Sequence, residues 1–153
     1  MLCDVYEGLG QVRVSELLGQ ISIGRLRTYQ MFDRIKTRLR LNKLNQENLK
    51  KIAPKGWARI LEGDEVLALE LAQSILVSHL EMIIEILNFL GVPHQEGFFE
   101  KDAEIAAHLT DGWQQRVLDN FRAKHPETLL LFYVNHLARE VSSESQVFVP
   151  AGA

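Results

Sequence analysis

Among its 153 residues the chain has only one cysteine, Cys3. An internal disulfide is therefore impossible, and a single thiol is typical of proteins from reducing compartments. The first residues, MLCDVYEGLGQVRV, contain acids and no apolar run, so they do not resemble a secretory signal. From these two features we expect a cytoplasmic protein.

The sequence also lacks the marks of a β-sheet protein. No part of it shows sustained alternation of apolar and polar residues, regularly spaced turn signals or a βαβ rhythm. No repeat of solenoid period is present. Apolar residues make up 46% and charged residues 24% of the chain, as in ordinary globular proteins. We therefore predict an all-α fold, a single-domain helical bundle of five to seven helices.

Catalytic motifs are missing as well. The chain contains no G-x-S-x-G, no phosphate-binding loop and no G-x-G-x-x-G after a strand. It also lacks the Glu-x-x-His pairs that carboxylate-bridged metal bundles need on two helices. Glu104/His108 and His136/Glu140 have a spacing that suits either a shared ligand face or an ordinary helix-surface pair. We assign no catalytic residue, metal site or cofactor, and we favour a protein that is not an enzyme.

The most helical stretch, residues 64–90, reads DEVLALELAQSILVSHLEMIIEILNFL. Its polar residues fall on one narrow strip at helical spacing: Glu70, Ser74, Ser78, Glu81, Glu85 and Asn88. The rest of the circumference is apolar, which indicates a helix surrounded on most sides. Gly91 suits a left-handed conformation after the last turn, and Pro93 blocks continuation. We predict one long helix at the centre of the bundle.

This long helix does not read as a transmembrane segment. Its carboxylates and His79 interrupt any apolar run of about 20 residues. His79 falls in the middle of the apolar face, where burial requires a hydrogen-bond partner. We interpret His79 as a buried polar residue satisfied by a hydroxyl or carbonyl group, with a ligand role as the alternative.

The remaining chain divides into an arm, a domain and a tail. Residues 1–13 contain two glycines and no clear period, which indicates an extended or poorly ordered arm. Residues 14–141 form the predicted helical domain, and 142–153 form a polar C-terminal tail. Within this tail, residues 146–149 could dock as an extended piece. The shorter predicted helices cover residues 16–19, 23–41, 46–52, 55–61, 102–109, a stretch after Thr110, and 126–141. In the stretch after Thr110, Trp113, Val117 and Phe121 recur every four residues.

Charge is distributed unevenly along the chain. Residues 24–59 contain eleven Lys or Arg and only two acids, whereas the rest of the chain is strongly acidic. In the helix predicted over 23–41, Arg27, Arg34 and Arg38 form a stripe opposite the apolar face. Such asymmetry suits a nucleic-acid or anionic-membrane surface, but also two parts of one fold that attract each other, or a self-complementary dimer. The sequence leaves these alternatives open.

Residues 14–30, VSELLGQISIGRLRTYQ, resemble the helix-turn-helix of MerR-type regulators in the pattern SIGRLRTYQ after a Ser-Glu-Leu-Leu-Gly turn. The match requires a two-residue deletion before Ile21, and the Gly-Leu and Pro-Arg wing of that family is absent. We therefore transfer no residue role from the family.

The favoured function is a small non-enzymatic interaction or assembly module that forms a homodimer or binds another protein. Its basis is the apolar circumference of two helices, which is generous for one 153-residue monomer to cover. The first alternative is nucleic-acid binding through the basic segment, with these candidate residues: Arg27, Arg34, Arg38, Lys50, Lys51 and Lys55. The second alternative is an enzyme or metal-binding protein that uses the polar set His94, Glu96 and His108, because loops often carry function.

Overall fold

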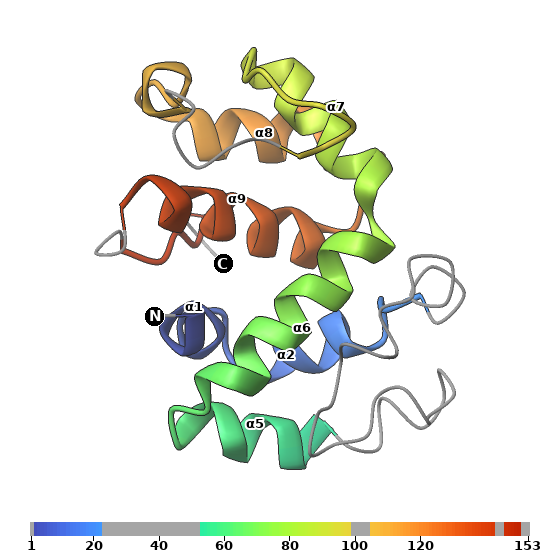
Figure 1. Ribbon diagram of the computed structural model, residues 1–153, viewed down its shortest axis with the longest axis vertical. Coiled ribbons are helices and arrows are strands. Elements are labelled where there is room, and N and C mark those ends of the chain that lie inside the picture. Colours follow the sequence, from blue (N-terminus) through green and yellow to red (C-terminus); the bar gives the residue numbers. More distant parts are fainter. Residues whose placement is uncertain (1, 23–52, 99–104, 143–145, 151–153) are drawn as a thin grey trace. The chain divides into compact units, whose positions relative to one another are not determined.

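A computed structural model describes residues 2–22, 53–98, 105–142 and 146–150 of the chain (Figure 1). Within this part of the protein there are seven α-helices, one short 3-10 helix and no strand. The all-α prediction is therefore confirmed. Several predicted features lie outside the described residues: the basic helix 23–41, the helix 46–52, and the candidate residues Arg27, Arg34, Arg38, Lys50 and Lys51.

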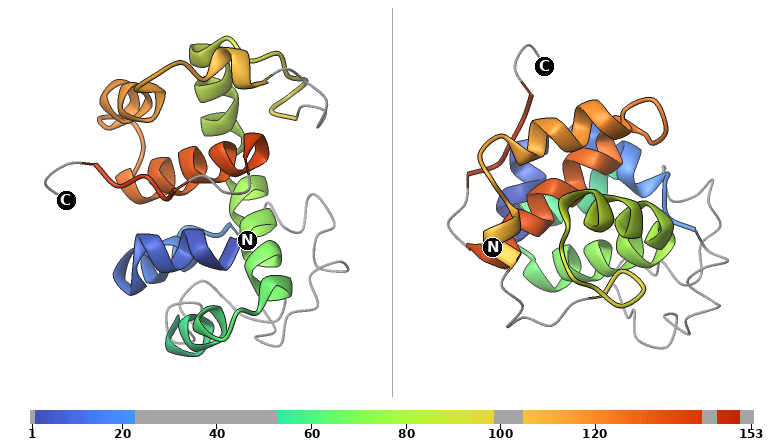
Figure 2. Two further views of the ribbon diagram at one scale, coloured as in Figure 1. Left: turned by 90° about the vertical axis from the view of Figure 1, so that its left-hand side faces the viewer. Right: turned by 90° about the horizontal axis from the view of Figure 1, so that it is seen from above.

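The chain divides into two compact units, Met1–Ser78 and His79–Ala153. The N-terminal unit contains α1 (Leu2–Leu9), α2 (Gln11–Leu18), α5 (Ala53–Leu61) and α6 (Glu65–Ser78). The C-terminal unit contains α7 (Leu80–Leu90), η3 (Ile105–His108), α8 (Trp113–Phe121) and α9 (Glu127–Val141). The helices of each unit are shown from further sides in Figure 2.

The helix predicted over 64–90 is wrong as one element, because the chain breaks at His79. His79 has non-helical dihedral angles (φ −131°, ψ 40°) and is half-buried, so the fully buried position expected for it is not observed. A physical reason lies just before the break. The hydroxyls of Ser74 and Ser78 donate to the carbonyls of Glu70 and Ser74, and such back-bonding weakens and bends helices. Ser78 also accepts the backbone N–H of Ser22, which ties the end of α6 to the end of the α2 segment.

The same two serines correct the predicted solvent strip of this stretch. Ser74 is fully buried and Ser78 nearly so, because the helix carbonyls satisfy their hydroxyl groups. Apolar residues of α6 are exposed instead, with Val66 at 69% and Leu69 at 49%. The exposed residues of α6 are therefore Val66, Leu69 and Gln73, two of them apolar, and not the serines that the sequence indicated.

Residues 2–18 form two helices where the sequence indicated an arm. Gly10, at φ 93°, separates α1 from α2. Helix α1 contacts α2, α5 and α6, and its residue Tyr6 is buried with its hydroxyl donating to the carbonyl of Ala68. The carboxylate of Glu65 accepts the backbone N–H groups of Leu2 and Cys3, so a distant residue caps α1. Local sequence could not show this, because both the packing and the cap come from α6.

The C-terminal unit is built around α8 and α9, which pack on each other. Trp113, Val117 and Phe121, which recur every four residues, are all buried on α8 as their spacing predicts. Nine residues of α9 are buried, so its apolar run is covered nearly all round. Gly91 ends α7 in the left-handed conformation, as predicted, and the N–H of Val92 closes the cap on the carbonyl of Leu87.

No helix in the described part of the chain is by itself long and apolar enough to cross a membrane. Helices α6 and α7 reach the required length and composition only when they are taken together across the break at His79.

Candidate functional site

His94, from the predicted polar set, fastens a tight turn after α7. Its Nε2 lies 2.7 Å from Asn88 Oδ1, and its Nδ1 accepts the backbone N–H of Gly97 at 3.0 Å. Because Nδ1 is an acceptor, the ring proton lies on Nε2 and is donated to Asn88. The turn is closed by two backbone hydrogen bonds between Gln95 and Phe98. Both ring nitrogens of His94 are thus engaged in holding the loop.

The other two members of the polar set lie on different pieces of the same unit. Glu96 is exposed at a positive φ of 53° inside the turn, and His108 is half-buried at the end of η3. In the described part of the chain, no three His, Cys, Asp or Glu residues are grouped so that they could hold a metal ion. A catalytic or metal-binding role for this set stays a prediction, which metal analysis of the purified protein would test.

The spaced pair His136/Glu140 does come close, with Nε2 and Oε1 3.9 Å apart. His136 stacks on Tyr133 and lies beside Phe132. Burial lowers the pKa of His136, and the nearby Glu140 carboxylate opposes that shift. This histidine is therefore held neutral among aromatic rings.

Glu85 joins α7 to the turn after α8. Its two carboxylate oxygens lie 2.6 Å from Lys124 Nζ and 2.8 Å from His125 Nε2. These two hydrogen bonds lower the pKa of Glu85 below its ordinary value. Glu85 therefore has both of these partners, Lys124 and His125, within its own unit.

Cys3 is not an accessible nucleophile. Its side chain is only 3% exposed, and burial, followed by the charge of Glu65, raises the pKa of the thiol to about 12. The buried thiol of Cys3 therefore contributes to the packing of α1.

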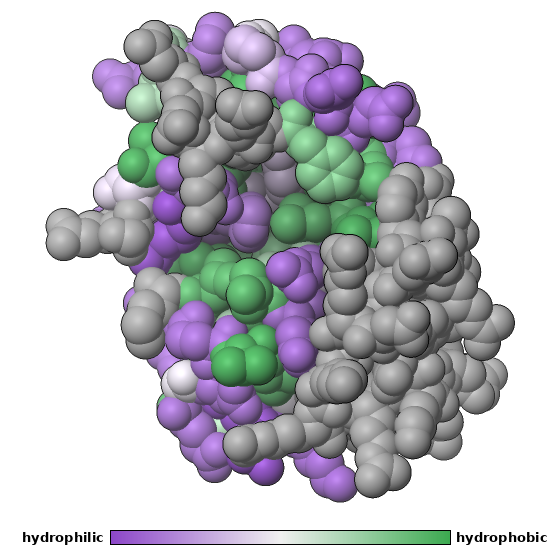
Figure 3. Space-filling view, viewed as in Figure 1, coloured by the Kyte–Doolittle hydropathy of each residue, from purple (hydrophilic) through white to green (hydrophobic). Residues whose placement is uncertain are grey.

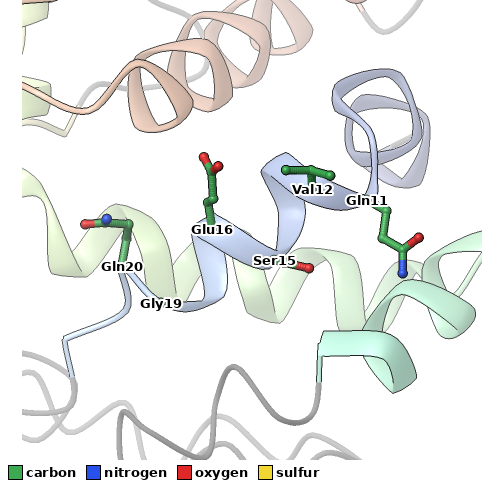
Figure 4. A pocket seen from close by; sticks show the side chains of 6 residues that line it. All are labelled: Gln11, Val12, Ser15, Glu16, Gly19 and Gln20. Carbon is green, nitrogen blue, oxygen red and sulfur yellow. The ribbon is translucent and has the colours of Figure 1, made fainter.

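A pocket of about 540 Å³ lies along α2 and is lined by Gln11, Val12, Ser15, Glu16, Gly19 and Gln20. Val12 and Glu16, one helical turn apart, point to the same side (Figure 4). The other side chains spread in different directions from the one helix instead of converging on a point. The lining offers amide, hydroxyl and carboxylate groups, but no arrangement of a nucleophile with a base.

The N-terminal unit exposes three apolar side chains on either side of the α5–α6 turn, Leu61, Val66 and Leu69, which together form the α5–α6 face. Leu61 is 56% exposed at the end of α5, and Val66 and Leu69 lie one turn apart on α6. Figure 3 shows apolar surface alternating with polar surface along the course that α6 follows in Figure 1. Exposed apolar side chains that gather on one part of the surface mark interaction surfaces more often than isolated ones do.

The turn between α5 and α6 holds this face in a fixed shape. The N–H of Asp64 donates to the carbonyl of Arg59, and the Asp64 carboxylate caps α6 at the N–H of Leu67. Gly63 supplies the positive φ of 80° that the turn requires. The face therefore needs little ordering before it meets a partner.

Of the six predicted anion-binding residues, Lys55 alone falls in the described part of the chain. It is exposed on α5, next to Arg59, whose side chain is 40% exposed and 3.7 Å from Glu62. At this separation and exposure the Arg59–Glu62 ion pair contributes little to the stability of the fold. Lys55 and Arg59, one helical turn apart, thus place positive charge on one side of α5.

Two features escaped the sequence analysis. The exposure of Val66 and Leu69 could have been suspected, since a helix that is apolar on every side must either be enclosed or leave one side open. Asn135 is the second feature, a buried polar residue within the apolar run of α9 that bonds to the C-terminal tail. A lone amide in such a run is a signal in itself, because burial demands partners for it.

Comparison with known proteins identifies no match to any protein family, curated protein or solved structure. The MerR-like pattern therefore gains no support from these comparisons.

Proposed function

We propose that this protein is a non-enzymatic assembly module and that it forms a homodimer through the α5–α6 face. The observation that supports the proposal is the exposure of Leu61, Val66 and Leu69 on two helices joined by a hydrogen-bonded turn. Full burial of an exposed Val or Leu contributes about 1.5–3 kcal/mol, and these residues, exposed at 56%, 69% and 49%, would contribute roughly half of that each. Three such side chains on one face provide a suitable centre for an interface.

Charge complementarity favours a second copy as the partner. Positive charge lies along α5 at Lys55 and Arg59, whereas acids Glu62 and Glu70 flank the apolar residues. A two-fold axis that sets α5 of one copy against α6 of the other would bring opposite charges together at the rim. Glu70 is already half-buried, and burial raises its pKa, so a nearby cation from the partner would stabilise its charged form.

The proposed site of action is the cytoplasm. Cys3 is the only cysteine, and it is buried, so the fold does not depend on an oxidising compartment.

Sedimentation equilibrium tests the proposal. We expect wild-type protein to dimerise at micromolar concentration and Val66→Asp to weaken the dimer at least ~10-fold, since burying a charge opposes association. Val66 lies in the first turn of α6, where an acid suits the helix, so the variant should remain folded. Val12→Asp is the matched control, because Val12 is 73% exposed on α2, away from the α5–α6 face. A clean wild-type monomer at high micromolar concentration would overturn the proposal.

The second candidate is nucleic-acid binding through residues 24–59. The exposure of Lys55 and Arg59 favours it, as does the excess of eleven cations over two acids in this segment. Binding to mixed-sequence DNA or RNA should weaken steeply as salt rises. Lys55→Gln should reduce the salt slope by about one, whereas Lys124→Gln, in the C-terminal unit, should leave it unchanged. Absence of any complex at low salt would dispose of this candidate.

A further inference from the structure

Asn135 lies where the apolar face of α9 meets the C-terminal tail. Its side chain is 2% exposed, and its neighbours in the sequence from Leu129 to Val134 are all buried apolar residues. A primary amide in such a place needs partners for two N–H groups and one oxygen.

The tail supplies most of these partners through its backbone. Asn135 Nδ2 donates to the carbonyl of Phe148 at 3.0 Å, and Asn135 Oδ1 accepts the N–H of Phe148 at 2.6 Å. The second N–H donates to the carbonyl of Leu131 in the same helix. The Asn135 amide thus forms hydrogen bonds with both the backbone N–H and the backbone C=O of Phe148 in an extended segment. Recognition of this kind depends on main-chain hydrogen bonds, with side-chain contacts adding selectivity.

The other side chains of the tail are mostly only partly buried. Pro150 is buried, but Val147 and Phe148 are only half-buried, and Gln146 and Val149 are exposed. Segments with few buried contacts open at low cost compared with a core helix. Opening leaves the Asn135 amide without two of its partners inside an apolar environment, so the site favours rebinding of an equivalent segment.

We propose that the surface around Asn135 is a binding site for an extended segment with the chemistry of residues 146–150, and that the same segment of a second copy can fill it by exchange. The occupant is the one whose fit the structure displays, a residue with free N–H and C=O groups that precedes a proline by two positions. Exchange of an identical element between protomers is a low-cost route to assembly. This site lies in the C-terminal unit and does not require the α5–α6 face.

A mixing experiment on the full chain tests the exchange. Both partners carry Val66→Asp, so that association through the α5–α6 face is suppressed. One partner also carries Asn135→Leu, which removes the site and keeps the tail; the other carries Phe148→Pro, which removes the N–H of the tail and keeps the site. Native mass spectrometry should show a two-chain complex in the mixture and only monomers in each sample alone. A mixture that stays monomeric at about 100 μM overturns the exchange, whatever the outcome for Val66→Asp alone.

A peptide of residues 144–153 provides the second measurement. The Phe148→Pro chain should bind it at least ~10-fold more tightly than wild type, because the attached tail competes at an effective concentration in the millimolar range. Adding Asn135→Leu should abolish this binding, and near-ultraviolet circular dichroism checks that each variant is folded. If Phe148→Pro does not fold, excess peptide added to wild type should reduce the hydrogen-exchange protection of the Phe148 amide. No binding in the first case, or unchanged protection in the second, contradicts the proposal.

Discussion

The cap that Glu65 provides for α1 gives the sharpest stability prediction. Its carboxylate accepts the N–H of Leu2 at 3.0 Å and of Cys3 at 3.1 Å, both in part-buried positions. Hydrogen bonds to charged groups contribute about 1.5–3 kcal/mol each, and partial exposure reduces that figure. We therefore expect Glu65→Gln, which keeps one acceptor oxygen and loses the charge, to cost about 1–2 kcal/mol in the opening of α1.

Cys3 reports this opening directly, because it is the only thiol in the chain. In the closed state its side chain is buried and its pKa is raised to about 12, so a thiol reagent at pH 8 reacts only with the open state. A loss of 1–2 kcal/mol corresponds to roughly a 5–30-fold higher open population and an equally faster labelling rate.

Glu62→Gln is the matched control for this measurement. It removes the same charge three residues earlier, where the Glu62 side chain is 66% exposed and its pairing with Arg59 spans 3.7 Å. We expect less than about a twofold change in the labelling rate of Cys3 for this control. If Glu65→Gln and Glu62→Gln label Cys3 at the same rate, the cap contributes nothing and the reasoning is wrong.

Three further predictions concern the C-terminal unit. Glu85→Gln should lower the stability of this unit by less than about 1 kcal/mol at pH 7. Because the folded pKa of Glu85 lies below its ordinary value of 4.5, the difference from wild type should vanish in thermal melts as pH falls below 4.5. Burial lowers the folded pKa of His136 below 6.5, the ordinary value for histidine, so its protonation favours unfolding. His136→Gln should therefore lose less stability than wild type as pH falls below 6.5. Equal slopes of stability against pH for variant and wild type would contradict this. Gly91→Ala should cost about 1–2 kcal/mol in urea unfolding, because φ is 76° at this position; an unchanged midpoint would show that the cap tolerates a side chain.

Where helical spacing and local chain breakers agree, the sequence was sufficient to predict the buried side of a helix or its end. The four-residue spacing of Trp113, Val117 and Phe121 identified the buried side of α8, and Gly91 marked the end of α7. Both outcomes depend on backbone geometry within a few residues, so tertiary contacts had little to change.

Where a polar residue can be either exposed or buried with a hydrogen-bond partner, the sequence was not sufficient to predict which occurs. Ser74 and Ser78 appear as a solvent strip by polarity, but their hydroxyls bond to carbonyls of their own helix and can therefore be buried. His94 appears reactive by its place in a loop, but Asn88 and Gly97 engage both of its ring nitrogens. Polarity along a sequence does not reveal which hydrogen-bond partners the fold will supply.

The sequence by itself determined the all-α class, because periodicity and turn residues act locally. Only the tertiary structure decided that residues 2–9 form a helix, since its cap comes from Glu65, and that the chain breaks at His79. It likewise decided that Val66 and Leu69 are exposed while Asn135 is buried against the tail. The cap of α1 and the burial of Asn135 rest on contacts between residues distant in sequence, which determine the partners of a side chain and its exposure to water. The break at His79 follows hydroxyl bonds to carbonyls four residues earlier, which the sequence permits but does not show to be formed.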